Sequence, residues 1–266
     1  MRIPLIVLFI FTALTVLITG FWDGVSGLVL PNTTWGLYSK SFFENVLGNL
    51  HGGIIDILVV SVILYWFIQR RTTKEDVARH EETLSDLRLY RAPDASYRIL
   101  GTVKRLLALG VKRLQLSELS LSGVEIKQIV FFNSDFHATV FTDSHLINIT
   151  IDCCNCDAAI FADAKLEHII LKNSSFRRAK FQDATLKGID FTSCQIEDAN
   201  FTNANLRSAN FRGVDCRGVD FKNADLQSAN FLGALNLSPL NISLAKNIKS
   251  LKSRDPSIKA LVDAVK

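Results

Sequence analysis

The residues of this 266-residue chain best suited to chemistry are its five cysteines and five histidines. Cys153, Cys154 and Cys156 lie close together, and such a cluster could hold a metal ion or form a disulfide. No histidine stands at a ligand spacing from these cysteines, and no phosphate-binding loop, zinc-protease or serine-hydrolase motif occurs. The sequence therefore predicts no catalytic residue, no cofactor and no metal site, and it argues against an enzyme.

Three aspartates form a second candidate set. Asp143, Asp163 and Asp183 follow one another at intervals of twenty residues, and the column continues as Asn203 and Asn223. If the chain repeats with that period, the carboxylates stack about 5 Å apart and repel one another unless water or cations intervene. They are candidate contacts for a basic partner, although the two asparagines favour ordinary polar turns.

Asp56, Arg70 and Arg71 interrupt or follow the apolar run of residues 54–68. An acidic residue inside a membrane span is a candidate functional residue. Asp56, however, lies in the first turn of the run, where it could instead reach the interface or cap a helix. The two arginines favour the cytoplasmic side of a membrane and are candidate contacts for lipid headgroups.

A five-residue repeat must position most of the other candidates. Every fifth residue from Leu116 to Phe231 is apolar, and this period fits neither a helix nor a flat strand. A fixed short period indicates a solenoid. The apolar positions also sort by twenty into columns of like residues, so four repeats would make one square coil. One such column is Leu121, Phe141, Phe161, Phe181, Phe201 and Phe221.

With this pattern, the chain resembles the pentapeptide-repeat family, whose repeat is roughly A-[DN]-[LF]-x-x. The clearest copies are Ala199-Asn200-Phe201, Ala204-Asn205-Leu206, Ala209-Asn210-Phe211, Ala224-Asp225-Leu226 and Ala229-Asn230-Phe231. The resemblance covers residues 114–235 and implies a right-handed quadrilateral β-helix, an all-β solenoid of about six coils. The repeats before Asp190 fit the pattern loosely, so less regular walls are expected there.

The repeat also assigns the cysteines and histidines to the inside or the outside of the solenoid. Inward cysteines act as small apolar residues, and the inward set is Cys154, Cys156, Cys194 and Cys216. Cys153 should point outward. Three histidines also fall on outward positions, where they are interpreted as surface polar groups: His137, His145 and His168.

A solenoid needs covers at both ends because its terminal coils would otherwise expose the core. Residues 96–108 carry apolar side chains at helical spacing and are predicted to seal the first coil. Residues 236–266 are predicted to form the C-terminal cap or tail, with Asp255-Pro256 starting a short final helix. Short α-helices are therefore expected at both ends.

Residues 70–113 are predicted to connect the membrane end to the solenoid and to include the N-terminal cap. This segment has 11 basic and 6 acidic groups, a net charge of +5, and could lie against anionic lipid headgroups or remain a solvated helix. A helix over 74–91 is expected to begin at Thr72 or Thr73 as its cap. Its apolar positions suit either a coiled coil between protomers or packing against the same chain: Val77, Leu84 and Leu87.

Two apolar runs, at about 3–21 and 53–68, predict a two-helix transmembrane hairpin within residues 1–69. Both termini and the repeats would then lie in the cytoplasm, at the inner membrane of a bacterium, with residues 22–50 outside. The alternative for the first run is a cleaved secretory signal.

These features favour a membrane-anchored scaffold whose cytoplasmic β-helix binds an unidentified protein. The alternative is an oligomeric pore-forming or membrane-disrupting effector gated through its cytoplasmic domain, for which Asp56 and a coiled coil would provide the parts. Imitation of duplex DNA against a topoisomerase, which some members of the family perform, is disfavoured because residues 114–235 carry 11 basic against 15 acidic groups. The expected partners are membrane lipids, a cytoplasmic protein and, in the coiled-coil case, a second copy; nucleic acid is not expected.

Overall fold

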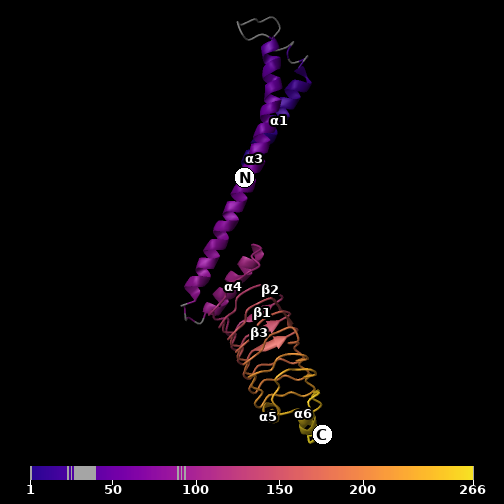
Figure 1. Cartoon of the computed structure of the whole chain (residues 1–266). Helices are drawn as coiled ribbons and strands as arrows, with labels where there is room; N and C mark the ends of the chain where they lie inside the picture. The colour runs from indigo at the N-terminus through magenta and orange to yellow at the C-terminus, as the bar shows by residue number, and fades with distance from the viewer. Residues whose placement is uncertain are drawn as a thin grey trace. The chain divides into compact units, whose positions relative to one another are not determined.

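The computed structural model describes residues 2–22, 24, 26, 40–88, 90, 92 and 94–265. The chain divides into two compact units, Met1–Lys74 and Glu75–Lys266, which are described separately (Figure 1). Much of the predicted outer loop, residues 27–39, lies outside the described residues.

Helices α1 (Arg2–Gly20) and α3 (Lys40–Leu87) contain the two predicted spans. Among the described residues, α3 is the one helix long and apolar enough to cross a membrane, and only 6% of its apolar window is buried. The arrangement of α1 and α3 as a transmembrane hairpin stays a prediction.

Helix α3 is much longer than expected, and this corrects two predictions. It continues without a break from the apolar run into the expected connector and ends at Leu87, so Thr72 and Thr73 are not caps: their hydroxyls donate back to the carbonyl of Gln69, at 3.0 and 2.9 Å. Such back-bonding leaves a threonine within a helix. Because α3 starts at Lys40, Asp56 lies several turns inside it and cannot cap the helix.

The solenoid arises because each repeat makes its own turn. Where an Asn or Asp precedes the central residue of a repeat, its side-chain oxygen accepts a hydrogen bond from the backbone two residues on, as Asn200 does from Thr202 (2.8 Å) and Asp220 from Lys222 (2.9 Å). The following corner residue adopts a left-handed conformation, with φ +62° at Asn203. The chain thus turns a corner every five residues.

Successive coils stack in parallel with an offset of twenty residues, which confirms the predicted period. We number the four sides by their central residues: side 1 contains Phe176, side 2 Phe181, side 3 Leu166 and side 4 Leu171. Side 3 carries strands β1 (Glu125–Lys127), β3 (His145–Ile147) and β5 (Lys165–Glu167), and side 4 carries β2 (Val130–Phe132), β4 (Thr150–Asp152) and β6 (Ile170–Lys172). Elsewhere, single parallel bridges join the coils.

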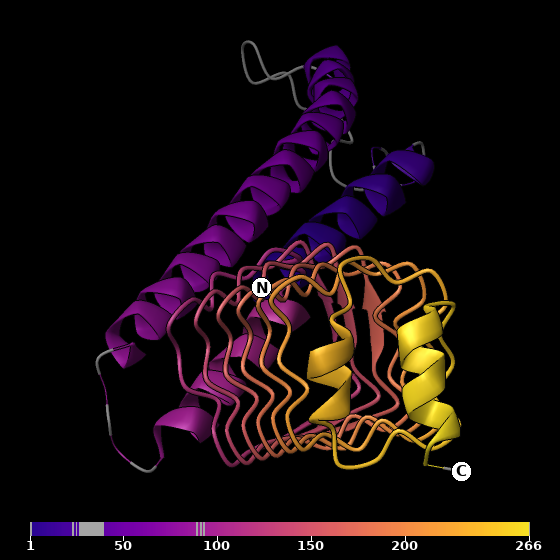
Figure 2. The same cartoon turned by 60° about the horizontal axis from the view of Figure 1, so that its bottom comes forward.

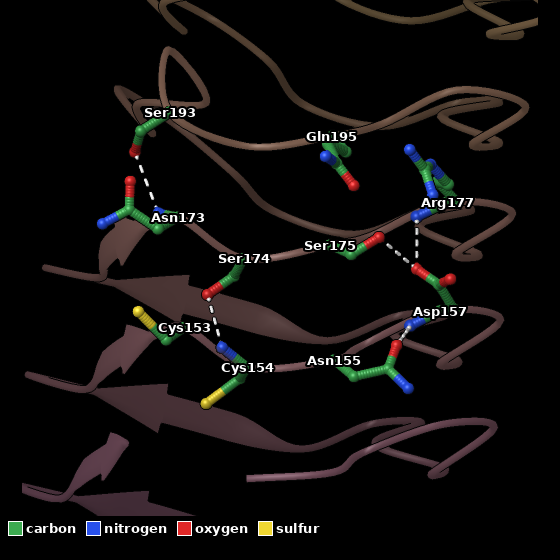
Figure 3. A pocket seen from close by; sticks show the side chains of 10 residues that line it. All are labelled: Cys153, Cys154, Asn155, Asp157, Asn173, Ser174, Ser175, Arg177, Ser193 and Gln195. Carbon is green, nitrogen blue, oxygen red and sulfur yellow. Dashed lines mark hydrogen bonds between the residues drawn. The ribbon is translucent and has the colours of Figure 1, made fainter. Parts of the chain in front are cut away.

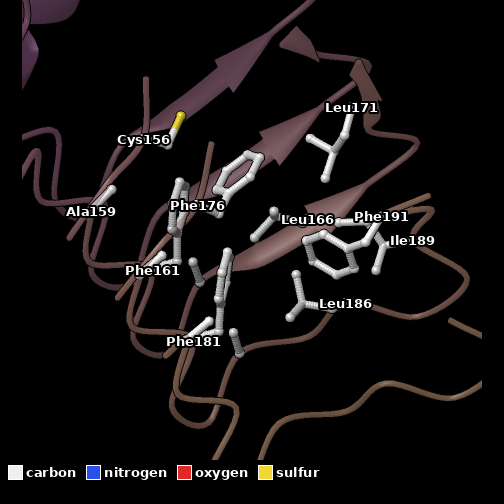
Figure 4. Packing of buried hydrophobic residues seen from close by; sticks show 14 of the residues in the cluster. Cys156, Ala159, Phe161, Leu166, Leu171, Phe176, Phe181, Leu186, Ile189 and Phe191 are labelled. Atoms are coloured by element: carbon white, nitrogen blue, oxygen red, sulfur yellow. The ribbon is translucent and has the colours of Figure 1, made fainter. Parts of the chain in front are cut away.

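The core of the solenoid is a stack of aromatic and aliphatic rungs (Figure 4). The ring of Phe161 lies 4.8 Å from that of Phe141, and Phe181 lies 4.9 Å from both Phe161 and Phe201, with interplanar angles of 4–7°. Stacking of Phe on Phe along side 2 was predicted and is confirmed.

Helix α4 (Ala95–Ala108) covers the first coil with its apolar face, where Ile99, Val103 and Leu106 are buried. Leu84 and Leu87 of α3 join the same hydrophobic cluster. Of the two roles left open for the apolar residues of the connector, packing against the same chain is therefore the one observed.

The far end of the solenoid continues beyond the last regular repeat. After α5 (Pro239–Ser243) the chain returns to two further sides, where Asn247 pairs with Asp225 and Lys252 with Asn230. Helix α6 (Pro256–Asp263) then begins at the predicted site, with the Asp255 carboxylate accepting from the backbone of Ser257 and Ile258. Figure 2 shows α5 and α6 together at this end.

Candidate functional site

Backbone pairing between coils breaks at one corner of the described repeats. On side 4, Asp190 pairs with Asn210 but not with Ile170. On side 1, Gln195 pairs with Ser175 but not with Asp215. The segment 190–195 thus pairs with the following coil at its start, through Asp190, and with the preceding coil at its end, through Gln195. We call this segment the coil step. The ladders of sides 2 and 3 are continuous past the coil step.

Ser193 is the corner residue of the coil step and differs from its counterparts. Among the described corners from Glu118 to Gly233, it alone lacks a positive φ. Its hydroxyl accepts a hydrogen bond from the backbone N–H of Asn173 (3.3 Å) and donates to the carbonyl of Leu171 (3.4 Å). A side chain therefore supplies contacts between coils that backbone carbonyls supply at other corners.

A groove of about 530 Å³ borders the coil step on side 1 (Figure 3). The carboxylate of Asp157 accepts hydrogen bonds from the Ser175 hydroxyl and from the backbone of Arg177 (3.1 Å), and the Arg177 guanidinium lies 3.3 Å from Glu197. Most of the lining is neutral and polar. The lining residues are Cys153, Cys154, Asn155, Asp157, Asn173, Ser174, Ser175, Arg177, Ser193 and Gln195.

The groove offers hydrogen bonds rather than a reactive group. A hydrogen bond from Cys153 to the neighbouring Asp152 carboxylate raises the pKa of the Cys153 thiol, so the thiol is poorly nucleophilic. Within the described residues, no cluster of three or more His, Cys, Asp or Glu could hold a metal ion. The arrangement can recognise a polar surface through amides, hydroxyls and one guanidinium.

The cysteines lie where the repeat predicted. Cys153 is exposed, and the other four are buried and free. Burial raises the pKa of Cys194 to about 11 and that of Cys216 to about 12. These thiols stay protonated and act as apolar core residues.

The structure brings Asp143, Asp163 and Asp183 together in one exposed corner column. Each has a φ between +57° and +59°, and its backbone N–H donates to a carbonyl of the next coil. Asp and Asn are the side-chain-bearing residues that best tolerate this conformation. Backbone geometry therefore accounts for the residue type in this column, as the asparagines suggested.

The other three sequence candidates belong to the Met1–Lys74 unit. Asp56 is exposed on α3, and the Arg70 guanidinium lies over the Trp66 ring. Arg71, also exposed, follows on the same helix. The groove, by contrast, was missed by sequence reasoning, because Ser208 and Ser228 have the same residue type as Ser193 yet take positive φ values.

Comparison with known families matches residues 171–234 to the model described as pentapeptide repeat region. The chain contains a pentapeptide-repeat domain. The offset of twenty residues and the inward Phe and Leu columns extend the same architecture upstream of the matched segment to residue 114. No curated protein matches the sequence.

Solved pentapeptide-repeat proteins are similar to this domain at low identity. QnrB1, described as a plasmid-mediated fluoroquinolone resistance protein, shares 17% identity at a TM-score of 0.25, over 57% of this chain and 92% of its own. A pentapeptide-repeat protein of the Arabidopsis thaliana thylakoid lumen shares 22% identity at a TM-score of 0.30, and the match covers 58% of this chain and 92% of that protein. HetL from Nostoc, described as involved in heterocyst differentiation regulation, shares 15% identity at a TM-score of 0.18. The match covers 59% of this chain and 96% of HetL. These likenesses carry no argument about a partner or a role.

Proposed function

We propose that this pentapeptide-repeat protein is a membrane-anchored scaffold that holds a protein partner at the cytoplasmic face of a bacterial inner membrane. The observation that carries the proposal is the exposed apolar stretch of α3. Between Glu44 and Arg70 the helix contains one charged residue, Asp56. At 1.5 Å per residue this stretch is about 37 Å long, enough for a hydrocarbon core of about 30 Å.

Trp66 and Arg70 support an interface at the C-terminal end of this stretch. Tryptophan rings prefer the headgroup region, and the adjacent basic residues Arg70, Arg71 and Lys74 favour the cytoplasmic side. The pentapeptide repeats follow on that side, so they would face the cytoplasm.

The scaffold role is supported by the groove beside the coil step. Its polar lining suits recognition of a protein surface, and its chemistry offers no catalytic group. The neighbouring outward positions on side 1 vary in charge, with Arg177, Glu197 and Arg217 in one column, whereas the inward positions are fixed by packing.

Cys153 provides a direct test of anchoring and orientation, because it is the one exposed thiol among the five cysteines. A membrane-impermeant maleimide should label the full chain in inverted inner-membrane vesicles and leave it unlabelled in intact spheroplasts. Cys153→Ser is the control that should abolish labelling. Labelling in intact spheroplasts, or release of the chain by alkaline carbonate, contradicts the proposal.

Photo-crosslinking in cells tests partner binding at the groove. A photoreactive phenylalanine at Gln195 should give a discrete adduct, whereas the same residue at Gln227, on side 3, should not. The two positions share the native residue type, which makes them a matched pair. Absence of an adduct at both positions argues against the scaffold, and adducts at both contradict binding that is specific to the groove.

A further inference from the structure

Helix α4 has a solvent face that the capping of the β-helix leaves unused. Its apolar stripe is buried against the first coil. The opposite stripe follows the helical period and consists of Tyr97, Arg98, Gly101, Lys104, Arg105 and Ala108. We call this stripe the outer face of α4.

The outer face of α4 and the residues beside it are basic. Between Asp94 and Arg113 there are five basic residues and one acidic residue, and Asp94 itself is paired with Arg98 at 2.7 Å. Lys104, Arg105 and Lys112 are exposed, and no described acidic group lies within ion-pair distance of them. The acidic residues that dilute the charge of the connector lie earlier, on α3 or beside it.

Two tyrosines accompany these charges. Tyr97 is 65% exposed, and Tyr90 is 41% exposed with the Arg98 guanidinium 5.5 Å from its ring centre. Tyrosine rings combine an apolar body with a polar hydroxyl and are enriched where a membrane meets water. The face therefore presents both features that favour an anionic bilayer surface: unpaired cations and interfacial aromatic rings.

We propose that the outer face of α4 binds the surface of a bilayer containing anionic phospholipids. Charge complementarity selects this occupant, and the exposed tyrosines favour a lipid interface over other polyanions. A second copy of the chain joined end to end is disfavoured, because the opposite cap is basic too, with exposed Lys246, Lys249 and Lys252. The inference goes beyond the proposed scaffold and does not require α3 to span the membrane.

The test uses the full chain in lipid nanodiscs. A fluorophore is attached at Ala108→Cys in a Cys153→Ser background, and the discs contain phosphatidylcholine with a headgroup nitroxide quencher, with or without phosphatidylserine. Phosphatidylserine should increase quenching, and added salt should reverse the increase. Lys104→Gln with Arg105→Gln should lower the bound-to-free ratio about fivefold for each charge, or roughly thirtyfold together.

Lys249→Gln with Lys252→Gln makes the same charge change at the other end and is the matched control. Equal quenching in both disc types, or equal loss in the two double variants, overturns the proposal. If an RNA oligonucleotide reverses the quenching at a lower concentration than that of the lipid, the face has left the bilayer for RNA. That result also overturns the proposal, in favour of a nucleic-acid site. Incorporation of the chain into neutral discs is measured separately, by co-elution of protein and discs. Failure to co-elute counts against the α3 anchor and not against the outer face of α4. In that case the outer face of α4 is tested by adding vesicles of the same two compositions to the unincorporated chain.

Discussion

The guanidinium carbon of Arg70 lies 4.1 Å from the ring centre of Trp66, one turn earlier on α3. A cation over an indole face is favourable, and the pair joins an interfacial ring to a charged group that must reach water. In the proposed membrane anchor, this contact would mark the point at which α3 leaves the hydrocarbon.

Trp66 should therefore report a shallow position. In a Trp22→Phe, Trp35→Phe background reconstituted in bilayers, a headgroup nitroxide should quench Trp66 more strongly than a nitroxide near the acyl-chain end. Arg70→Ala should weaken the headgroup preference, since the ring loses its partner at the interface. Stronger quenching by the deep probe would place the end of the span elsewhere.

Gly218 should tolerate alanine less well than Gly213. Both have positive φ, +68° and +71°, so alanine costs about 1–2 kcal/mol of backbone strain at either position. At Gly218 a Cβ would also lie 1.9 Å from the Asp198 carboxylate, whereas at Gly213 nothing lies within 4 Å.

Gly218→Ala should consequently lower the free energy of unfolding by about 1–3 kcal/mol more than Gly213→Ala, measured by urea unfolding. In an Asp198→Ala background, which carries its own strain at φ +60°, adding Gly218→Ala should cost no more than Gly213→Ala costs in the native chain. An equal effect of the two single variants would show that the carboxylate moves aside.

Phe181→Ala should destabilise the β-helix by about 3–5 kcal/mol, because it leaves a cavity in a continuous stack. The lost contacts are those to Phe161 and Phe201. Phe132→Ala is the control, since that ring is 43% exposed on side 4, and its effect should stay within about 0.5–1 kcal/mol. Similar melting temperatures for the two variants would contradict a core built on the Phe column.

Thiol alkylation should depend on pH in a defined sense. The Asp152 carboxylate raises the pKa of Cys153, so near pH 8 less thiolate is present than for a free cysteine. Asp152→Asn should lower that pKa and speed alkylation of Cys153 by iodoacetamide at pH 8. The four buried thiols should react only on unfolding, and rapid labelling of all five in the folded protein would show that the coils open.

Sequence reasoning succeeded where one residue type serves one geometric need. The inward Phe column followed from its spacing, because only stacked coils bring Phe161 beside Phe181. The buried cysteines followed from the same spacing.

It failed where a residue type is compatible with two geometries. Thr72 can cap a helix or lie inside one, and it lies inside because α3 continues through Gly52 and Gly53 as far as Leu87. Ser193 and Ser208 differ in φ although their residue type is the same. Only the stacking of whole coils determines that difference.

The coil step gives the rod a preferred direction of bending. Across it, sides 2 and 3 keep unbroken ladders, while sides 4 and 1 each lose one rung. A force that bends the β-helix therefore meets less resistance when it separates the coils at the Ser193 corner. At the opposite corner, between sides 2 and 3, the same bending would have to stretch backbone hydrogen bonds between coils. We therefore expect the β-helix to bend most easily at this corner, and a partner held in the adjoining groove would change how far it bends.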